Sequence, residues 1–171
     1  VADGINQQSD NYKLIDAKAI TAGCRAQKSS NELALLQQAK TMTMEVHKAV
    51  ARILYQGIST QEVTSFINQA HIKVGIPAGS YFCIVLFGED SSYPHGVKSP
   101  KTLAMNDIVL IDTGCQLEGY NSDITRTYVF GEANQRQRDM WQLEKNAQLS
   151  AFDAAKIGVP CGDVDVAARA Y

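Results

Sequence analysis

The sequence lacks the features that would place the chain in a membrane or direct it to secretion. No run of apolar residues approaches the roughly 18 residues that a membrane-spanning helix needs. The N-terminus carries neither an initiator methionine nor a signal-peptide pattern. We therefore expect no membrane partner. We also expect a piece of a longer protein, because the chain starts at Val1 and stops at Tyr171 within a helical pattern.

An excess of charge of one sign is also missing. Sixteen basic and eighteen acidic residues give a formal net charge of −2. Nucleic-acid-binding domains usually carry a basic patch, so this balance predicts no nucleic-acid partner. Hydrophobic residues make up 45% of the chain and charged residues 20%, which is ordinary for a domain with one hydrophobic core.

Cysteine is scarce, and its spacing excludes two kinds of site. The four cysteines form no Cys-x-x-Cys pair and no zinc-knuckle spacing. Scattered thiols in a domain of this size indicate a reducing compartment, and we expect a cytoplasmic location. The four are Cys24, Cys83, Cys115 and Cys161.

Two consecutive amphipathic helices dominate the first half of the chain. Apolar residues recur at intervals of three and four over residues 31–54 and again over residues 60–74. A capping-box pattern precedes each stretch, Ser29 with Glu32 and Ser59 with Glu62. Two histidines, His47 and His71, fall within these patterns. We interpret them as helix-surface or boundary residues and assign them no role.

The second half alternates strand and helix patterns. Residues 81–87 form a continuous apolar run of strand length, and residues 107–130 contain two β-rich runs around a polar gap. Residues 134–157 and 161–171 predict two further helices. In the first of these we expect an inward-facing stripe of apolar residues, which comprises Met140, Leu143, Ala147, Ala151, Ala154 and Ala155.

This order of elements predicts an α+β domain with helices packed on one face of a mostly antiparallel sheet. Residues 1–24 begin with polar residues and continue through Tyr12 to Asp16. We interpret them as a linker with a short strand, or as the tail of a missing N-terminal domain. Residues 25–171 would then form the domain proper.

The β-rich stretch contains two aspartates, Asp112 and Asp123, eleven positions apart. If the runs form a hairpin whose turn centres on Leu117 and Glu118, the two residues lie directly opposite each other. Their Cβ atoms would then be about 4.5–5.5 Å apart. Carboxylates this close repel each other, so the arrangement favours a cation between them. Two divalent ions about 3.5–4 Å apart would fit. The alternative is an exposed hairpin with two solvated aspartates.

His95 is a candidate for catalysis because of its position in the chain. It lies in a polar loop, residues 88–101, between two predicted strands, and Gly96 after it leaves room for a ligand. A lone histidine is still more often structural.

A rival interpretation comes from Asp112-Thr113-Gly114, which is also the signature of aspartic proteases. That class needs a mostly β chain and a second matching aspartate. Here the first half is helical, and no second Asp-Thr-Gly or Asp-Ser-Gly occurs.

Taken together, these motifs resemble the pita-bread metallopeptidase superfamily, which includes methionine aminopeptidases, prolidases and creatinases. The likeness is closest to the Xaa-Pro aminopeptidases and dipeptidases (prolidases). Residues 25–32 are similar to the junction at which those enzymes join an N-terminal domain to the catalytic domain. The motifs, in order, are His95-Gly96, Asp112-x-Gly114, and Gly119-Tyr120-x-Ser122-Asp123-Ile124-Thr125-Arg126-Thr127.

The resemblance implies a role for four residues. Asp112 and Asp123 would be metal ligands, with Asp123 bridging two divalent ions. His95 would be a catalytic residue outside the metal shell, and Tyr81 would line the substrate-binding site or pack in the core. The implied reaction is hydrolysis of the Xaa-Pro bond of a proline-containing peptide. An oxygen-rich ligand set favours Mn²⁺, with Co²⁺ or Zn²⁺ as alternatives.

The family also uses a histidine in a His-Gly-x-Gly segment and two glutamates, none of which matches a position of this sequence. The chain thus resembles the first half of a pita-bread domain. Two carboxylates leave most of an octahedral shell to water, so we expect weak or absent metal binding and no peptide turnover by this chain alone. Uncovered apolar surface predicts a homo-oligomer.

Two alternatives to this function stay open at the level of the sequence. One is a related hydrolase on the same fold, a methionine aminopeptidase or a creatinase. The other is a pita-bread domain that serves as a non-catalytic binding module. The presence of both aspartates argues against creatinase and against the binding module, and the segment 25–32 argues against a stand-alone methionine aminopeptidase.

Overall fold

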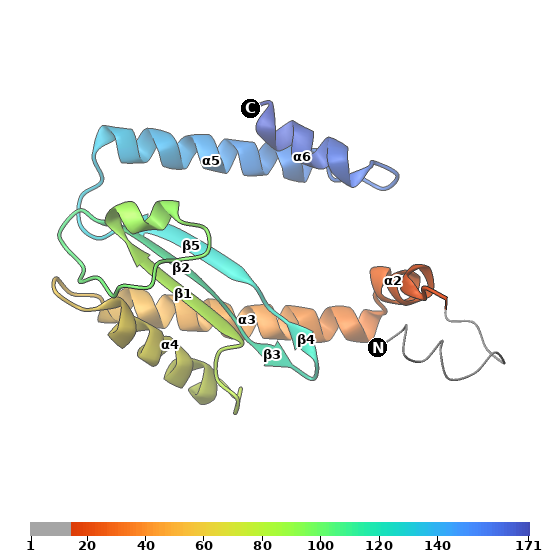
Figure 1. Ribbon diagram of the computed structural model, residues 1–171, viewed down its shortest axis with the longest axis horizontal. Coiled ribbons are helices and arrows are strands. Elements are labelled where there is room, and N and C mark those ends of the chain that lie inside the picture. The colour runs from red at the N-terminus through yellow and green to blue at the C-terminus, as the bar shows by residue number, and fades with distance from the viewer. Residues whose placement is uncertain (1–14) are drawn as a thin grey trace, which may run out of the picture.

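The computed structural model describes residues 15–171, which form an α+β domain (Figure 1). The predicted fold class is therefore confirmed. The elements in chain order are α2 (Lys18–Ala26), α3 (Ser30–Ile53), α4 (Thr60–Lys73), β1 (Phe82–Phe87), the short 3₁₀ helix η1 (Gly88–Ser92), β2 (Ile108–Gly114), β3 (Gln116–Leu117), β4 (Tyr120–Asn121), β5 (Ile124–Val129), α5 (Gln135–Ala154) and α6 (Cys161–Arg169).

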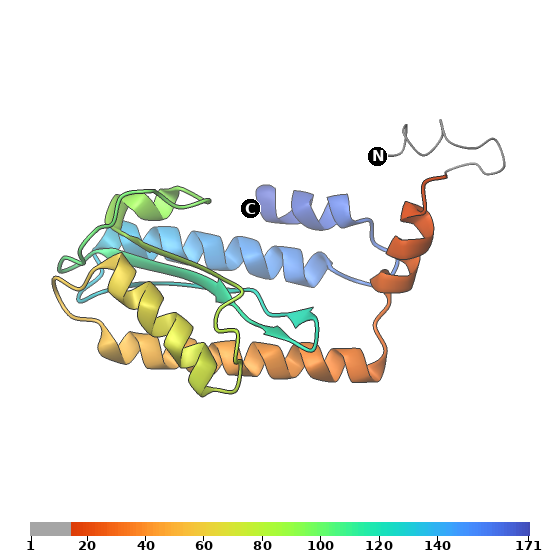
Figure 2. The same ribbon diagram turned by 60° about the horizontal axis from the view of Figure 1, so that its bottom comes forward.

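The main sheet has three antiparallel strands in the order β1-β2-β5. Strands β3 and β4 pair with each other and extend the β2–β5 hairpin beyond the sheet. In both views this extension lies along the N-terminal half of α3 (Figures 1 and 2). The hairpin therefore contacts the helix over a longer distance than the three-stranded sheet alone would allow.

Helices α3 and α4 begin where their capping boxes predict. The side chain of Ser29 accepts a hydrogen bond from the Glu32 amide, and the Glu32 carboxylate accepts one from the Ser29 amide. Ser59 and Glu62 repeat the arrangement at the start of α4. Each box satisfies amide groups that the first helical turn leaves unpaired.

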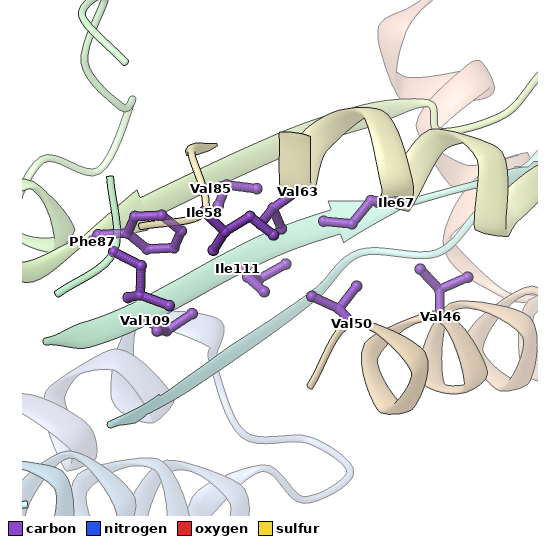
Figure 3. Packing of buried hydrophobic residues seen from close by; sticks show 10 residues of the cluster. Val46, Val50, Ile58, Val63, Ile67, Val85, Phe87, Val109 and Ile111 are labelled. Atoms are coloured by element: carbon purple, nitrogen blue, oxygen red, sulfur yellow. The ribbon is translucent and has the colours of Figure 1, made fainter. Parts of the chain in front are cut away.

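The hydrophobic core lies between one face of the sheet and the helices α3 and α4 (Figure 3). Alternate residues of β2, Val109, Ile111 and Thr113, are fully buried on this face because successive side chains of a strand point to opposite sides. The buried cluster comprises Val46, Val50, Ile58, Val63, Ile67, Val85, Phe87, Leu103, Val109 and Ile111.

The prediction for the two helix histidines is wrong. His71 is fully buried and His47 is 7% exposed. Both lie on the helix faces that pack toward the sheet: His71 follows Ile67 by four positions, and His47 lies between Val46 and Val50 in the core stripe of α3. Nε2 of His47 and both ring nitrogens of His71 are hydrogen-bonded, and these bonds offset the free-energy cost of burying the polar atoms.

The prediction of an inward-facing stripe on α5 is also wrong. Neither α5 nor α6 has a buried residue, and Met140 and Leu143 are 52% and 47% exposed. The two helices pack on each other beyond β5, on the side away from α3 and α4 (Figures 1 and 2). Among residues 15–171, no further element covers their apolar side chains.

The N-terminal region differs in part from the prediction. The short strand predicted near residues 12–16 falls largely outside the described residues. Residues 18–26 form α2, a helix that the sequence patterns did not predict. Across residues 15–171, we find no helix with the length and apolar character that crossing a membrane requires.

Candidate active site

The hairpin that carries the two aspartates has a different register from the predicted one. Leu117 pairs with Tyr120, so the turn consists of Glu118 and Gly119. Both have positive φ angles, 49° and 83°, as a two-residue type I′ turn requires. The predicted turn one residue earlier would place Leu117 in the left-handed region, which a leucine rarely adopts.

This register moves the two aspartates from a direct to a diagonal pair. Asp112 lies opposite Thr125, so the prediction that it faces Asp123 directly is wrong. Ser122 and Ile124 are buried on the α3 side of the sheet, and Asp123 between them projects to the other face. Asp112 lies on that same face because it alternates with the buried Ile111 and Thr113.

The two carboxyl groups interact electrostatically. The pKa of Asp123 is raised above its ordinary value, first by partial desolvation and then by the negative charge and close contact of Asp112. The hydroxyl of Thr125 donates a 2.8 Å hydrogen bond to Oδ1 of Asp112 and fixes that carboxylate in place. Two like charges that share one face are the arrangement that a cation would relieve.

The donor set fits part of a metal site. Asp112 and Asp123 supply carboxylate oxygens, the ligands that hard divalent cations prefer. Residues 15–171 contain no group of three or more His, Cys, Asp or Glu side chains that could hold a metal ion. Within this part of the chain the two aspartates could therefore supply only part of a coordination shell, with most of it left to other ligands.

His95 lies beside the neighbouring strand instead of at the aspartates. Its loop turns at Gly96, whose amide donates to the Tyr93 carbonyl and which lies over Ile84 and Leu86 of β1. A cavity of about 580 Å³ between this loop and α4 is lined by His95 and Ile84. Neither aspartate lines that cavity, although Ile84 is the partner of Asp112 across the β1–β2 pairing.

Tyr81 is exposed at the start of β1. Its side chain is 61% exposed, so the alternative that it packs in the core is wrong. The ring contacts Phe82 edge-on, at 6.4 Å between centroids, and its amide donates to the carbonyl of Gly114 at 2.8 Å. Tyr81 is thus tied to the end of the strand that carries Asp112.

Gly114 and Ser122 form a tight contact, which explains why the two sequence motifs contain a glycine and a serine at these positions. A Cβ atom at position 114 would collide with the carbonyl oxygen of Ser122, so only glycine fits. The Ser122 hydroxyl accepts a 2.8 Å hydrogen bond from the Cys115 amide, and the Ser122 amide donates to the Cys115 carbonyl at 2.9 Å. The two strands are therefore joined directly beside Asp123.

Sequence reasoning missed a layer of buried polar side chains beneath the hairpin. Thr43, His47 and His71 all point from α3 and α4 toward it. Burial lowers the pKa of both histidines below its ordinary value, which favours their neutral forms. The available signal was position, since all three lie on the same helical faces as the apolar stripes.

Comparison with known proteins places the chain among peptidases. The model of metallopeptidase family M24 matches residues 34–171. YkvY of Bacillus subtilis (strain 168), provisionally named a dipeptidase, is 36% identical over 171 residues, which cover 98% of this chain and 46% of that protein. An uncharacterised peptidase of Staphylococcus aureus (strain bovine RF122 / ET3-1) is 33% identical over 142 residues, 83% of this chain and 40% of its own length.

Two solved structures are similar over nearly the whole chain. Prolidase from Pyrococcus furiosus superposes with a TM-score of 0.84 at 31% identity, over 89% of this chain and 45% of that one. The Xaa-Pro dipeptidase from Bacillus anthracis gives a TM-score of 0.90 at 27% identity, over 99% of this chain and 48% of that one. The chain spans about half the length of the relatives it matches.

Proposed function

Because the chain belongs to metallopeptidase family M24, we propose that it supplies Asp112 and Asp123 as ligands to two divalent metal ions in a peptidase. The resemblance to prolidases that the sequence motifs indicate is confirmed by the relatives, and so is a pita-bread fold matched over about half its length. The metal site and the substrate go beyond that membership: the residues support the metal site, and the solved relatives support the substrate.

One observation carries the metal site. Asp112 on β2 and Asp123, which directly precedes β5, project onto the same face, close enough for the charge of Asp112 to raise the pKa of Asp123. A protein gains no stability from such a pair unless a cation lies between them. Carboxylate ligands favour Mn²⁺, with Co²⁺ and Zn²⁺ as the alternatives.

Each residue of the site has a defined task. When bound, divalent ions supply Lewis acidity and lower the pKa of water. Asp112 and Asp123 hold the ions, and the Thr125 hydroxyl orients the Asp112 carboxylate. His95 binds the substrate or transfers a proton to it from the loop beside β1. Tyr81, exposed at the start of β1, lines the substrate-binding site.

The proposed substrate is a peptide with proline in the second position, cleaved at the Xaa-Pro bond. This choice rests on the solved relatives, which are named as a prolidase and an Xaa-Pro dipeptidase. The proposed location is the cytoplasm, because all four cysteines are free thiols, as reducing conditions would leave them.

We also propose that the chain forms a homo-oligomer. Helices α5 and α6 expose large apolar side chains, among them Trp141, Phe152 and Val166. Exposed apolar surface, where it is contiguous, drives association.

The test combines metal binding with hydrolysis. Mn²⁺ binding is measured by titration calorimetry on the 171-residue chain, and hydrolysis of Xaa-Pro and Met-Xaa dipeptides on the chain and on the longest reading frame that contains it. We expect weak Mn²⁺ binding by the chain that Asp123→Asn abolishes. In the longer protein we expect Xaa-Pro hydrolysis that the same substitution lowers by at least about a thousandfold, since metal ions supply several kcal/mol of transition-state stabilisation.

Three outcomes would contradict the proposal. Hydrolysis of Met-Xaa peptides without Xaa-Pro cleavage would indicate a methionine aminopeptidase. Full activity after Asp123→Asn or after removal of metal by a chelator would exclude the metal role. Binding of peptides by the longer protein without any turnover would indicate a non-catalytic module. Asp153→Asn, an exposed aspartate on α5, is the matched control and should change none of these readouts.

A further inference from the structure

Helix α3 contacts the residues on both sides of Asp123. Oγ1 of Thr43 lies 2.7 Å from Oγ of Ser122, the residue before the aspartate. Nε2 of His47 lies 2.9 Å from the carbonyl oxygen of Ile124, the residue after it. Since a carbonyl oxygen only accepts, His47 donates this hydrogen bond. Thr43 and His47 are four positions apart, so both project from one face of the helix.

We propose that Thr43 and His47 are positioning residues that clamp the backbone on either side of Asp123 and thereby hold its carboxylate in place for metal binding. The role in metal binding rests on the proposed function. The clamp itself does not, because it consists of contacts between described residues. Neither side chain touches the carboxylate. Both act through the neighbouring residues, from the opposite face of the sheet.

A buried chain of hydrogen bonds supports the Thr43 arm of the clamp. Nδ1 of His71 lies 3.2 Å from the Ile67 carbonyl and 3.0 Å from the Ser80 hydroxyl. Nε2 of His71 lies 3.2 Å from the Thr43 hydroxyl. The Thr43 hydroxyl in turn shares a 2.7 Å hydrogen bond with the Ser122 hydroxyl. The network therefore runs without a break from α4 through Thr43 to Ser122.

The same chain reaches the strand that carries the other aspartate. The Ser122 hydroxyl is hydrogen-bonded to Thr43 and accepts from the amide of Cys115, which follows β2 directly. Asp112 lies three residues before Cys115 in that strand. The network therefore fixes the ends of both strands relative to each other and to α3. Because its members are buried and each has a partner, rearrangement would leave an unpaired polar group in the core.

The clamp also specifies the register of the hairpin. A slip of β5 by one residue would turn Asp123 into the core and Ser122 toward the open face. Apolar residues at positions 43, 47 and 122 would pack in either register, whereas the two hydrogen bonds form in one. At its exposed tip the hairpin has a separate tie to α3, a 2.8 Å hydrogen bond from the Tyr120 hydroxyl to the Glu32 carboxylate. That tie cannot replace a buried clamp, because water competes for it.

The test compares Thr43→Val with Thr43→Ser in the 171-residue chain. Valine keeps the shape and removes the hydroxyl, and serine keeps the hydroxyl. The readout is amide hydrogen exchange at Cys115, Ser122 and Ile124 relative to Val85 in the core strand β1. Losing one buried hydrogen bond should raise the hairpin rates about two- to tenfold over the core rate in Thr43→Val, and Thr43→Ser should stay near the wild type.

Two further variants keep the test decisive. His47→Phe keeps a ring and removes the donor to Ile124, and it should raise the relative exchange of the hairpin in the same way. Thr41→Val, on the exposed side of α3, is the matched control and should raise nothing. Equal acceleration of hairpin and core amides in Thr43→Val would indicate a general loss of stability. That result, or no acceleration at all, would overturn the clamp.

A second readout separates the clamp from the metal. Mn²⁺ broadens NMR signals of nearby nuclei, so the Asp123 and Thr125 amides report its binding. We expect broadening in the wild type that needs a several-fold higher Mn²⁺ concentration in Thr43→Val and returns in Thr43→Ser. Broadening of equal strength in all three would overturn the role in metal binding. No broadening in the wild type would refute Mn²⁺ binding by this chain alone, and the exchange data would still decide the clamp.

Discussion

The two sides of the three-stranded sheet differ in how far their apolar side chains are buried and their polar side chains hydrogen-bonded. On one side, α3 and α4 cover the sheet. The apolar cluster there is buried, and the buried histidines His47 and His71 make hydrogen bonds. On the other side lie two carboxylates that repel each other, and beyond β5 lie two helices without a buried residue.

The difference shows what an amphipathic pattern can and cannot specify. Helices α3 and α5 both begin with a capping box, formed by Ser29 and Glu32 in one and by Asn134 and Gln137 in the other. Helix α3 packs against the sheet, whereas α5 has no buried residue and contacts β5 at Trp141, whose indole donates a hydrogen bond to the Thr127 carbonyl at 3.3 Å. A stripe of apolar residues thus predicts which face of a helix can pack against a neighbour. Whether that face is buried depends on which other elements lie beside the helix.

The largest expected effect compares one phenylalanine from each side. Phe87 at the end of β1 is fully buried in the core cluster, whereas Phe152 on α5 is 75% exposed. We expect Phe87→Ala to lower the free energy of unfolding by about 3–5 kcal/mol, because it removes buried surface and leaves a cavity. Phe152→Ala should change it by less than about 0.5 kcal/mol. Urea denaturation of both variants measures the difference, and similar losses in the two would refute the contrast.

Much of this fold could be predicted from the sequence because its signals are local. The capping boxes, the spacing of apolar residues and the apolar run of residues 81–87 each act within a few positions of the chain, and α3, α4 and β1 lie where they predict. The orientation of α5 could not be predicted in this way. It depends on which surfaces meet in space, and so does the burial of His47 and His71.

The residues of the candidate site could be predicted from the sequence, but the register that sets their relative positions could not. The motif Asp112-x-Gly114 with Ser122-Asp123 identifies the carboxylate pair, and the structure explains its glycine and serine by their contact. The register depends on whether the turn starts at Leu117 or Glu118. The turn needs a positive φ at its first residue, and Glu118 adopts one. The positions of Thr43 and His71 within the apolar stripes indicate burial, but their contact with Ser122 joins distant parts of the chain and depends on the tertiary packing.

The second expected effect is a loss of stability in acid on the covered side. Burial lowers the pKa of His47 and His71 below the ordinary value of 6.5, so the unfolded chain binds more protons than the folded one. Their contribution to stability is therefore complete above pH 6.5 and is lost as the pH falls toward the folded-state values.

Urea denaturation as a function of pH measures this effect. The free energy of unfolding should fall as the pH drops from neutrality through 6.5, the ordinary histidine pKa. His71→Phe removes one of the titrating groups and should flatten part of that slope, whatever its effect on stability at neutral pH. A slope that is equally steep in His71→Phe would assign the acid sensitivity elsewhere.

A smaller effect concerns the uncovered helices. If α5 and α6 associate through their apolar side chains, Phe152→Glu should weaken self-association by at least about tenfold, since it places a charge in an apolar contact. Tyr55→Glu replaces a side chain that is 54% exposed after the end of α3 and serves as the matched control. Sedimentation velocity over a range of concentrations measures both. A wild-type chain that stays monomeric at high concentration would refute the proposed homo-oligomer.

The smallest expected effect is a gain in stability on the open side. Asp123→Asn removes the repulsion from Asp112 and should raise Tm at neutral pH by about 1 °C, because the pair is solvent-exposed and largely screened. The raised pKa of Asp123 gives the sign: the repulsion is present above that pKa and disappears when the group is protonated. The gain should therefore vanish below 3.8, the ordinary aspartate value. A lower Tm at neutral pH would mean that Asp123 makes a favourable contact in the metal-free chain, and the argument that the pair awaits a cation would lose its basis.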